Sequence, residues 1–291
     1  MLRRIRHAAR VRFVEAVQDG VRHELGGVRE DLGALRDEVR RLHERVDAMD
    51  AGLRQYMWAW ERRQRRDILT AVDYEALRTS AEFMRAEFGH AEHFTDKHDT
   101  LRASLARAPR EGLYLEFGVA SGSTLSIIVA NAPAGVVYGF DSFEGLPEDW
   151  RPGFAVGAFA TEKVPDVPGA DLVVGWFDDT LPGFLEKHDE SVAFLHLDAD
   201  LYSSTRTVLT ALAPRLAEGT VILFDEYFNF PGWEEHEHRA WTEFVAERGL
   251  RFEYLAYTAE DEQVAVRLLN APGEAPDADE QAERSLEQSR S

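Results

Sequence analysis

The sequence contains no cysteine and no long apolar run, and each absence excludes a class of protein. Without cysteine, the 291-residue chain forms no disulfides, which suits a reducing compartment. It has no run of about 20 apolar residues that would cross a membrane. Its arginine-rich start lacks the apolar segment of a secretory signal. We therefore expect a cytoplasmic protein.

Positive charge is scarce outside the first quarter of the chain. The net charge is −20, yet residues 1–66 hold 16 arginines against 11 acids and are basic. The remainder is therefore even more acidic than the whole. A strongly acidic body repels the phosphate backbone of nucleic acids, so we expect no nucleic-acid partner.

Residues 1–66 also carry the clearest periodicity. Apolar residues recur in alternating steps of four and three from Val21 to Trp60, which is the spacing of a coiled-coil seam. On its flanks, Glu24 would face Arg29 of a parallel second copy, a match in sign that the next heptads repeat. We expect a parallel homo-oligomer through residues 21–60, either a dimer or a trimer. The alternative is a long helix packed on its own chain. The seam consists of Val21, Leu25, Val28, Leu32, Leu35, Val39, Leu42, Val46, Met49, Leu53, Tyr56 and Trp60.

Three further segments lie outside the seam and the main domain. Residues 2–18 are basic and partly apolar. They fit either an amphipathic helix on an anionic membrane surface or, as we favour, a helix that leads into the seam. Residues 67–110 look helical and form either a connector or a lid over the following domain. Residues 271–291 form an acidic, polar tail that we expect to be disordered.

Residues 111–270 alternate between strand and helix patterns, as an α/β fold with a parallel sheet requires. We expect a Rossmann-like sheet of five parallel strands plus a C-terminal antiparallel hairpin at the sheet edge, with helices on both faces. The expected strands are 113–117, 135–141, 171–176, 192–198 and 220–225, and the hairpin strands are 251–257 and 263–269. The expected helices are 123–131, 181–188, 203–217 and 234–248.

The first expected strand leads into a glycine-rich turn. Residues 114–117 are mostly apolar, Gly118 and Gly122 follow, and a helix pattern begins at about Ser123. Glycine lets the backbone approach a ligand closely, and the helix N-terminus offers free N–H groups. A strand, turn and helix of this kind hold nucleotide-like ligands at the carboxyl edge of a sheet. The alternative is an ordinary tight turn without a ligand.

Residues 111–270 resemble the class I S-adenosylmethionine-dependent methyltransferases, which end in such a hairpin. Within them, three stretches resemble the macrocin O-methyltransferase (TylF-type) family. They are Phe140-Asp-Ser-Phe-Glu-Gly-Leu-Pro147, Gly175-Trp-Phe-Asp-Asp-Thr-Leu-Pro182 and Leu197-Asp-Ala-Asp-Leu-Tyr-Ser-Ser-Thr205. The resemblance implies methyl transfer from S-adenosylmethionine to a hydroxyl, typically on a sugar, with Mg²⁺. It covers a little over half of the chain and leaves out the heptads.

The resemblance also implies which residues hold the cofactor. Asp141, at the end of the second strand, would accept hydrogen bonds from the ribose hydroxyls. The glycine turn would cradle the methionine part, and Phe177 and Asp178 would lie against the adenine. The alternatives are turn or loop residues without a ligand. The residues assigned to the cofactor are Glu116, Gly118, Ala120, Ser121, Gly122, Thr124, Asp141, Ser142, Phe177 and Asp178.

Acids follow the fourth and fifth strands and predict a metal site. Asp198, Asp225 and Glu226 stand where two adjacent parallel strands end, so their carboxylates are expected to converge. Converging carboxylates repel one another unless they are protonated or bind a cation, and oxygen ligands suit Mg²⁺. The related catechol O-methyltransferases have Asn at the third position, where this chain has Glu226. Asp200 is a further candidate as ligand or base.

The residue that receives the proton of the acceptor hydroxyl is left open. The catechol enzymes place a lysine three residues after the first metal-binding Asp, where this chain has Leu201. Asp198 and Asp200 are the catalytic residues that we favour, and His236 or His238 are alternatives. His196 alternates with leucines and is expected in the core. The aromatic residues Tyr202, Tyr227 and Trp233 are expected either in an acceptor pocket or in the core.

The function that we expect is Mg²⁺-assisted O-methylation of a sugar or a glycosylated small molecule. The alternative is a non-catalytic oligomeric scaffold whose methyltransferase-like domain binds the cofactor only. An NAD-dependent oxidoreductase is disfavoured by the terminal hairpin and by the incomplete glycine pattern of the first turn.

Overall fold

A computed structural model describes residues 2–133 and 137–273, with side chains in the first helix from residue 10 onward. The chain divides into two compact units, Met1–Thr70 and Ala71–Ser291. The expected acidic tail 271–291 lies almost wholly outside the described residues, as do residues 135 and 136 of the second expected strand. No helix in the described part is long and apolar enough to span a membrane.

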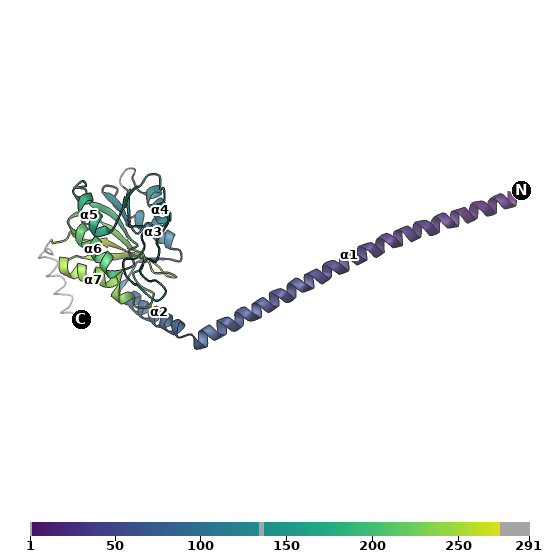
Figure 1. Ribbon diagram of the computed structural model, residues 1–291, viewed down its shortest axis with the longest axis horizontal. Coiled ribbons are helices and arrows are strands. Elements are labelled where there is room, and N and C mark those ends of the chain that lie inside the picture. The colour runs from purple at the N-terminus through teal and green to yellow at the C-terminus, as the bar shows by residue number, and fades with distance from the viewer. Residues whose placement is uncertain (1, 134–136, 274–291) are drawn as a thin grey trace. The chain divides into compact units, whose positions relative to one another are not determined.

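The first unit consists of the helix α1 (Leu2–Arg66), drawn in purple and blue in Figure 1, and the first residues of the next helix, which begins at Ile68. Side chains of the expected seam point to solvent in the single chain. Their exposed fractions run from 43% for Val39 to 73% for Met49. Short-range ion pairs such as Arg40–Asp37 lie along the helix, and arginines in its last turn suit the negative end of the helix dipole. The helix is therefore formed as expected, and its apolar stripe stays uncovered.

The second unit contains an eight-stranded mixed sheet in the order β1-β7-β8-β6-β5-β2-β3-β4. Five neighbouring strands are parallel, and β7 and β8 form the expected antiparallel hairpin, with β8 against β6. The parallel strands are β2 (Leu113–Phe117), β3 (Val137–Asp141), β4 (Asp171–Val174), β5 (Val192–Leu197) and β6 (Val221–Phe224); the hairpin strands are β7 (Phe252–Thr258) and β8 (Val264–Leu268).

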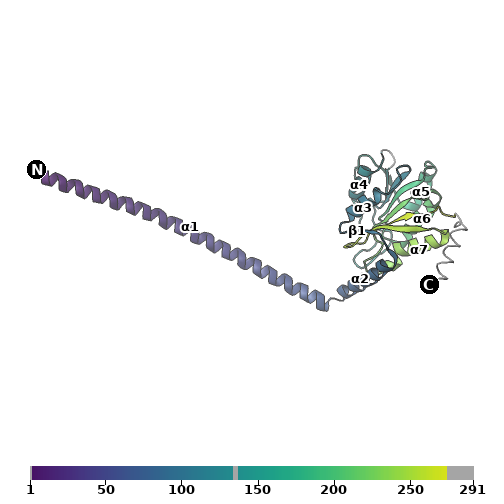
Figure 2. The same cartoon turned by 180° about the vertical axis from the view of Figure 1, so that it is seen from behind.

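Helices cover both faces of this sheet, as Figures 1 and 2 show from opposite sides. On one face pack α5 (Phe177–Leu185), α6 (Tyr202–Leu212) and α7 (Glu237–Arg248); on the other pack α3 (Lys97–Leu105) and α4 (Ser123–Asn131). Alternate residues of β2 supply the two cores: Leu113 and Leu115 face one layer and Tyr114 the other. This two-residue period is why a strand buried on both faces is apolar throughout.

The expected layout needs one correction. A short strand, β1 (Glu92–Phe94), pairs in parallel with β7, so the hairpin does not form the edge of the sheet. Two of its three residues are exposed, and it lacks the apolar alternation that marks a strand. The sequence therefore indicated only helix in this region.

Several helix boundaries also differ from those expected. The helix expected at 181–188 is α5, which begins earlier, at Phe177, with Asp178 and Asp179 in its first turn. Acids there suit the positive end of the dipole. The helix expected at 203–217 changes at Ala213 to a 3₁₀ turn that contains Pro214, and the one expected at 234–248 starts with a 3₁₀ turn, Trp233–Glu235, before α7.

The connector region packs into the second unit. The far end of α2 (Ile68–Glu87) lies beside the core, where the Asn229 backbone N–H donates to Ser80 Oγ at 2.8 Å. Phe88 just beyond it is 3% exposed. Within residues 67–110, Lys97 lines the pocket described below. The choice between a connector and a lid stays a prediction.

Candidate active site

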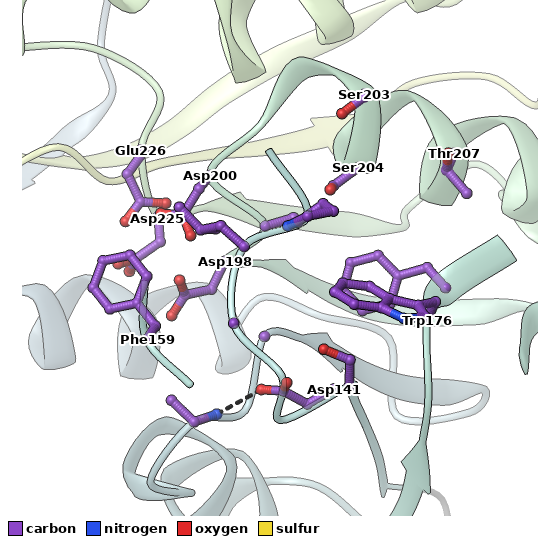
Figure 3. Close-up of a pocket in the computed structure, with 18 of the residues that line it drawn as sticks. Asp141, Phe159, Trp176, Asp198, Asp200, Ser203, Ser204, Thr207, Asp225 and Glu226 are labelled. Atoms are coloured by element: carbon purple, nitrogen blue, oxygen red, sulfur yellow. Dashed lines mark hydrogen bonds between the residues drawn. The ribbon is translucent and has the colours of Figure 1, made fainter. Parts of the chain in front are cut away.

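A pocket of about 580 Å³ opens at the carboxyl ends of the parallel strands (Figure 3). Gly118 follows β2, Asp141 ends β3, Asp198 follows β5 and Asp225 follows β6, and all four line it. Adjacent parallel strands end at the same edge, and ligands of open α/β sheets bind there. The fold therefore gathers these separate stretches of sequence at one site.

Gly118 brings the turn after β2 into direct contact with the turn after β5. Its φ is +94°, and a Cβ atom built on it would lie 1.8 Å from the carbonyl oxygen of Asp198. Only glycine fits such an approach. Gly122, the N-cap residue of α4, also has a positive φ and packs against Val167. The two glycines thus serve the close packing of the turn as well as its curvature.

The carboxylate of Asp141 ties the glycine turn to the end of β3. Its Oδ2 accepts from the backbone N–H groups of Val119 and Ala120, both at 2.8 Å, and its Oδ1 accepts from Phe143 N–H at 2.6 Å. A carboxylate accepts about four hydrogen bonds. Three are in use, so Asp141 has room for about one ribose hydroxyl in this arrangement, where we expected it to bind two.

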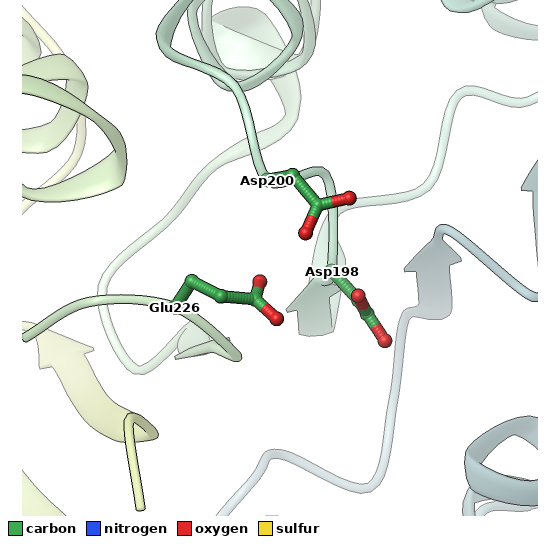
Figure 4. Close-up of side chains that lie close together, drawn as sticks. All are labelled: Asp198, Asp200 and Glu226. Atoms are coloured by element: carbon green, nitrogen blue, oxygen red, sulfur yellow. The ribbon is translucent and has the colours of Figure 1, made fainter. Parts of the chain in front are cut away.

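Three carboxylates converge on the other side of the pocket. Asp198, Asp200 and Glu226 each offer an oxygen, and these oxygens lie within 4.8 Å of one another (Figure 4). Burial and the charge of the nearby Asp225 raise the pKa values of all three, that of Asp200 to about 7. Asp200 holds a left-handed backbone with φ of +58°, which aspartate tolerates better than most residues. Ionising all three together is therefore unfavourable unless a cation or protons offset their charge.

The three carboxylates that converge are not the three that we expected as metal ligands. Asp225 lines the pocket, but it is not in the converging group, where Asp200 stands instead. Lys97 Nζ lies 3.2 Å from Asp225 Oδ2, and His196 Nε2 lies 3.6 Å from its Oδ1. Burial alone would raise the pKa of Asp225, but these two partners lower it to about 2. Asp225 is therefore an ionised partner of two basic groups.

These contacts belong to a row of alternating charges. His196 is 1% exposed, and its Nδ1 lies 2.8 Å from Oε1 of Glu116, which is fully buried. Burial disfavours the charged imidazole, but the carboxylates of Asp225 and Glu116 raise the pKa of His196 to about 10. The order Glu116, His196, Asp225, Lys97 thus runs from the core to the pocket. His196 lies in the core, as expected, and its two ring nitrogens face the carboxylates of Glu116 and Asp225.

Glu237 supports the two turns that carry the converging carboxylates. It is fully buried in α7, and its Oε2 accepts from the Glu226 backbone N–H at 3.1 Å. The Ala199 backbone also hydrogen-bonds to it, and burial raises its pKa well above the usual range. One side chain therefore holds the turns after β5 and β6 in register.

Most residues expected at the cofactor line the pocket, but not all. Glu116 is in the core, bonded to His196, and does not line it. Ser121, Gly122 and Thr124 also lie outside the lining. The expected residues that do line the pocket are Gly118, Ala120, Asp141, Ser142, Phe177, Asp178, Asp198, Asp200, Asp225 and Glu226.

The alternative bases and the expected aromatic residues do not line the pocket. His236 and His238 are both absent from it, and burial lowers the pKa of His238 to about 4. Tyr227 and Trp233 are in the core, with exposed fractions of 0% and 3%. Tyr202 instead donates to Glu243.

Trp176, Lys97 and Phe159 are among the residues that line the pocket but were not assigned from the sequence. Trp176 stands inside a stretch already singled out, directly before Phe177, so a signal for it was present. Lys97 is one of only three lysines in the chain, and it follows Asp96, the N-cap of α3. Phe159 lies in the long connection between β3 and β4, where no motif points to it.

Comparison with known proteins shows what the sequence around this pocket is similar to. Residues 115–227 match the family model described as a methyltransferase domain. Demethyldecarbamoylnovobiocin O-methyltransferase of Streptomyces niveus is 32% identical over 122 residues, which are 34% of this chain and 45% of that protein. Mycinamicin III 3''-O-methyltransferase of Micromonospora griseorubida is 40% identical over 67 residues, 22% of this chain and 25% of that protein.

One solved structure illustrates the structural likeness. The O-methyltransferase NovP is 22% identical, with a TM-score of 0.47 over 60% of this chain and 80% of that chain. The chain spans less than half the length of the curated relatives that it matches. Residues 115–227 thus match a methyltransferase-domain model, and parts of the chain are similar in sequence to parts of O-methyltransferases.

The contacts of His196 with Glu116 and Asp225 should make the stability of the protein depend on pH. The folded-state pKa of His196, about 10, lies above the unfolded value of 6.5, so its stabilising effect is complete below about pH 6.5 and is lost as the pH rises toward 10. His196→Gln should lower the free energy of unfolding by about 3 kcal/mol at pH 6 and by much less at pH 9.5. Urea unfolding at both pH values measures this, with the exposed His90→Gln as control. An equal loss at both pH values would contradict a charged His196.

Proposed function

We propose that this chain is an S-adenosylmethionine-dependent O-methyltransferase that transfers a methyl group to a hydroxyl of a sugar or a glycosylated small molecule, assisted by Mg²⁺. One observation carries the proposal. In the pocket of the methyltransferase domain, the glycine turn held by Asp141 faces a group of three converging carboxylates. The relatives named above are O-methyltransferases of novobiocin-type and mycinamicin-type molecules, which supports this choice of acceptor class.

The cofactor is assigned to the side of the pocket that holds Asp141 and Trp176 (Figure 3). The turn from Gly118 to Ala120 offers backbone close to the ligand, and Asp141 offers its remaining hydrogen-bonding capacity to the ribose. Trp176 and Phe177 supply apolar surface for the adenine. The many acids of the pocket also favour a positively charged sulfonium.

The residues present fit a divalent cation. Asp198, Asp200 and Glu226 converge, and Glu226 Oε2 is buried without a hydrogen-bond partner among the described residues. A buried, unpartnered carboxylate oxygen is costly, and a hard cation would satisfy it. We therefore assign these three residues as the ligands, with Asp225 beside them, held by Lys97 and His196. A bound Mg²⁺ would lower the pKa of the acceptor hydroxyl and fix its orientation.

The chain's own residues then orient and deprotonate the acceptor. The hydroxyl oxygen attacks the methyl carbon in line, the carbon–sulfur bond breaks, and S-adenosylhomocysteine leaves. We assign the hydroxyl proton to one carboxylate, that of Asp198 or that of Asp200, because both line the pocket and His236 and His238 do not. The main contribution of the protein is to hold both substrates in reacting geometry.

The apolar stripe of α1 supports a parallel homo-oligomer. Its seam residues are roughly half exposed in the single chain, and the flanking charges match in sign only when the copies run parallel. A second copy of this chain is therefore the occupant that we propose for residues 21–60. Membrane-surface contact by residues 2–18 stays a prediction, since the side chains of residues 2–9 lie outside the described part.

Cofactor binding provides the first test. S-adenosylhomocysteine should bind with a dissociation constant of about 1 μM, equivalent to about 8 kcal/mol. Asp141→Ala should weaken binding at least about tenfold, because the glycine turn loses two hydrogen bonds and the ribose loses its acceptor. Isothermal titration calorimetry measures both. Failure to bind S-adenosylhomocysteine would refute the proposed function, and binding of NAD in its place would favour an oxidoreductase instead.

Metal dependence provides the second test. Asp198→Asn should lower kcat by about a hundredfold, because the developing charge in the transition state is less stabilised, and EDTA should do the same to the unaltered chain. Asp189→Asn, at a side chain 98% exposed, is the matched control. Full turnover by Asp198→Asn in the presence of EDTA would refute the metal assignment.

The oligomer is tested in the full-length chain by sedimentation equilibrium. Leu32→Lys with Val39→Lys should convert the oligomer to a monomer, because both changes bury charge in the seam. Ala34→Lys with Ala51→Lys adds the same charge away from the seam and should leave the oligomer intact. If the unaltered chain is a monomer at micromolar concentrations, the proposed pairing is wrong.

A further inference from the structure

The pocket is strongly biased in charge. Seven acidic side chains line it, and Lys97 is the one basic side chain among the described residues that do so. Lys97 is already paired with Asp225. Arg151, the next basic group near the carboxylates, is paired with Glu262 at 3.1 Å. Because Lys97 and Arg151 are both paired, the pocket offers no unpaired basic side chain for a phosphate. A bound divalent cation and a sulfonium together would still not neutralise seven carboxylates.

The pocket also has two distinct sides. In Figure 3, Asp141 and Trp176 lie on one side of Asp198, and the ring of Phe159 lies on the other, with Glu226 and Asp225. The first side is the one assigned to the cofactor. The second side is therefore left for the molecule that is methylated, and its wall combines an aromatic ring with carboxylates.

Phe159 presents an unusual amount of apolar surface there. It is 51% exposed although it lines a pocket, and its backbone is left-handed, with φ of +66°. A bulky residue in that region is strained and persists only where its surroundings hold it. The carbonyl of Phe143 accepts from Thr161 N–H at 3.2 Å, and that of Ala158 accepts from Leu146 N–H at 2.9 Å, so the loop on both sides of Phe159 is fixed.

A row of packed aromatic side chains holds the Phe159 ring. Phe159 stacks on Phe154 with centroids 5.2 Å apart, and Phe154 packs on Trp150 at 5.3 Å. The guanidinium of Arg151 lies 4.0 Å from the centre of the Trp150 ring and is anchored by Glu262. The ring is therefore pre-positioned, and ordering it on binding costs little.

We propose that Phe159 is the platform on which the acceptor sugar ring stacks, and that this sugar carries no phosphate or carboxylate. The inference rests on the proposed function and specifies its substrate. The less polar face of a sugar ring presents C–H groups that suit the negative face of an aromatic ring, and its hydroxyls reach the carboxylate group beside it. A nucleotide-diphosphate sugar would bring two phosphates to a site rich in carboxylates, which disfavours it.

This proposal fixes the place of the reaction in a sequence. A sugar linked to a nucleotide diphosphate loses that group when a glycosyltransferase joins it to its acceptor. The substrate is therefore supplied by a glycosyl transfer, and methylation follows attachment of the sugar.

The test uses the full-length chain with S-adenosylmethionine and MgCl₂. Methyl glycosides of rhamnose, fucose, glucose and galactose are each compared with the matching nucleotide-diphosphate sugar, and methyl transfer is measured as kcat/KM. We expect the best uncharged glycoside to exceed its nucleotide form by about a hundredfold. Equal or higher kcat/KM for the nucleotide sugars overturns the proposal.

The role of Phe159 is tested by Phe159→Ala against Val156→Ala, an exposed residue of the same loop that does not line the pocket. Phe159→Ala should raise KM for the glycoside about tenfold and leave kcat and the affinity for S-adenosylhomocysteine unchanged. Val156→Ala should change none of these. If both variants give the same KM, Phe159 is not the platform.

Binding of the glycoside is measured as well, so that the proposal is tested even if no glycoside is methylated. Saturation-transfer NMR on the S-adenosylhomocysteine-loaded protein should show contacts to ring protons of a methyl glycoside that Phe159→Ala removes. No contact with any uncharged glycoside, while S-adenosylhomocysteine binds, overturns this inference alone. Failure of S-adenosylhomocysteine itself to bind would instead refute the proposed function.

Discussion

A row of alternating charges from Glu116 through His196 and Asp225 to Lys97 connects the centre of the sheet to the pocket. Its members come from β2, β5, the end of β6 and the start of α3, so it joins elements that are distant in the sequence. A buried charge is tolerated only when it is paired, and here each inner member has a partner on both sides. The row keeps Asp225 ionised, and its charge in turn raises the pKa values of Asp198, Asp200 and Glu226.

The uncompensated negative charge of the pocket follows from this arrangement. Lys97 and His196, the basic groups nearest to the carboxylates, are both used by Asp225. Glu237 fixes the positions of the neighbouring turns but adds no positive charge. The three converging carboxylates are therefore left for a cation, and the rest of the pocket suits ligands that are positive or uncharged. The pairs that Asp225 forms with Lys97 and His196 thus affect both the stability of the fold and the charge of the ligands that the pocket accepts.

The sequence predicted the parts of this site that follow from strand order. Asp141, Asp198 and Glu226 stand directly at strand ends, and the ends of adjacent parallel strands converge whatever the loops do. Glu116 does not line the pocket: its side chain is buried and contacts His196, which is 80 positions away in the sequence. A contact between residues so far apart could not be predicted from the local sequence. Lys97 and Phe159 reach the pocket from segments without a motif. The small strand β1 was missed because its residues are mostly exposed and polar.

The contact between Gly118 and Asp198 has a thermodynamic consequence. The cofactor turn and the first assigned metal ligand touch through backbone atoms with no space between them, and Asp198 N–H donates to the carbonyl of Phe117, one residue before that glycine. A shift of either turn is therefore transmitted directly to the other. If a cation draws Asp198 toward its ideal position, the affinity for the cofactor changes, and the cofactor must change the affinity for the cation by the same factor. The order in which the two arrive then affects the kinetics of loading but not the final occupancy.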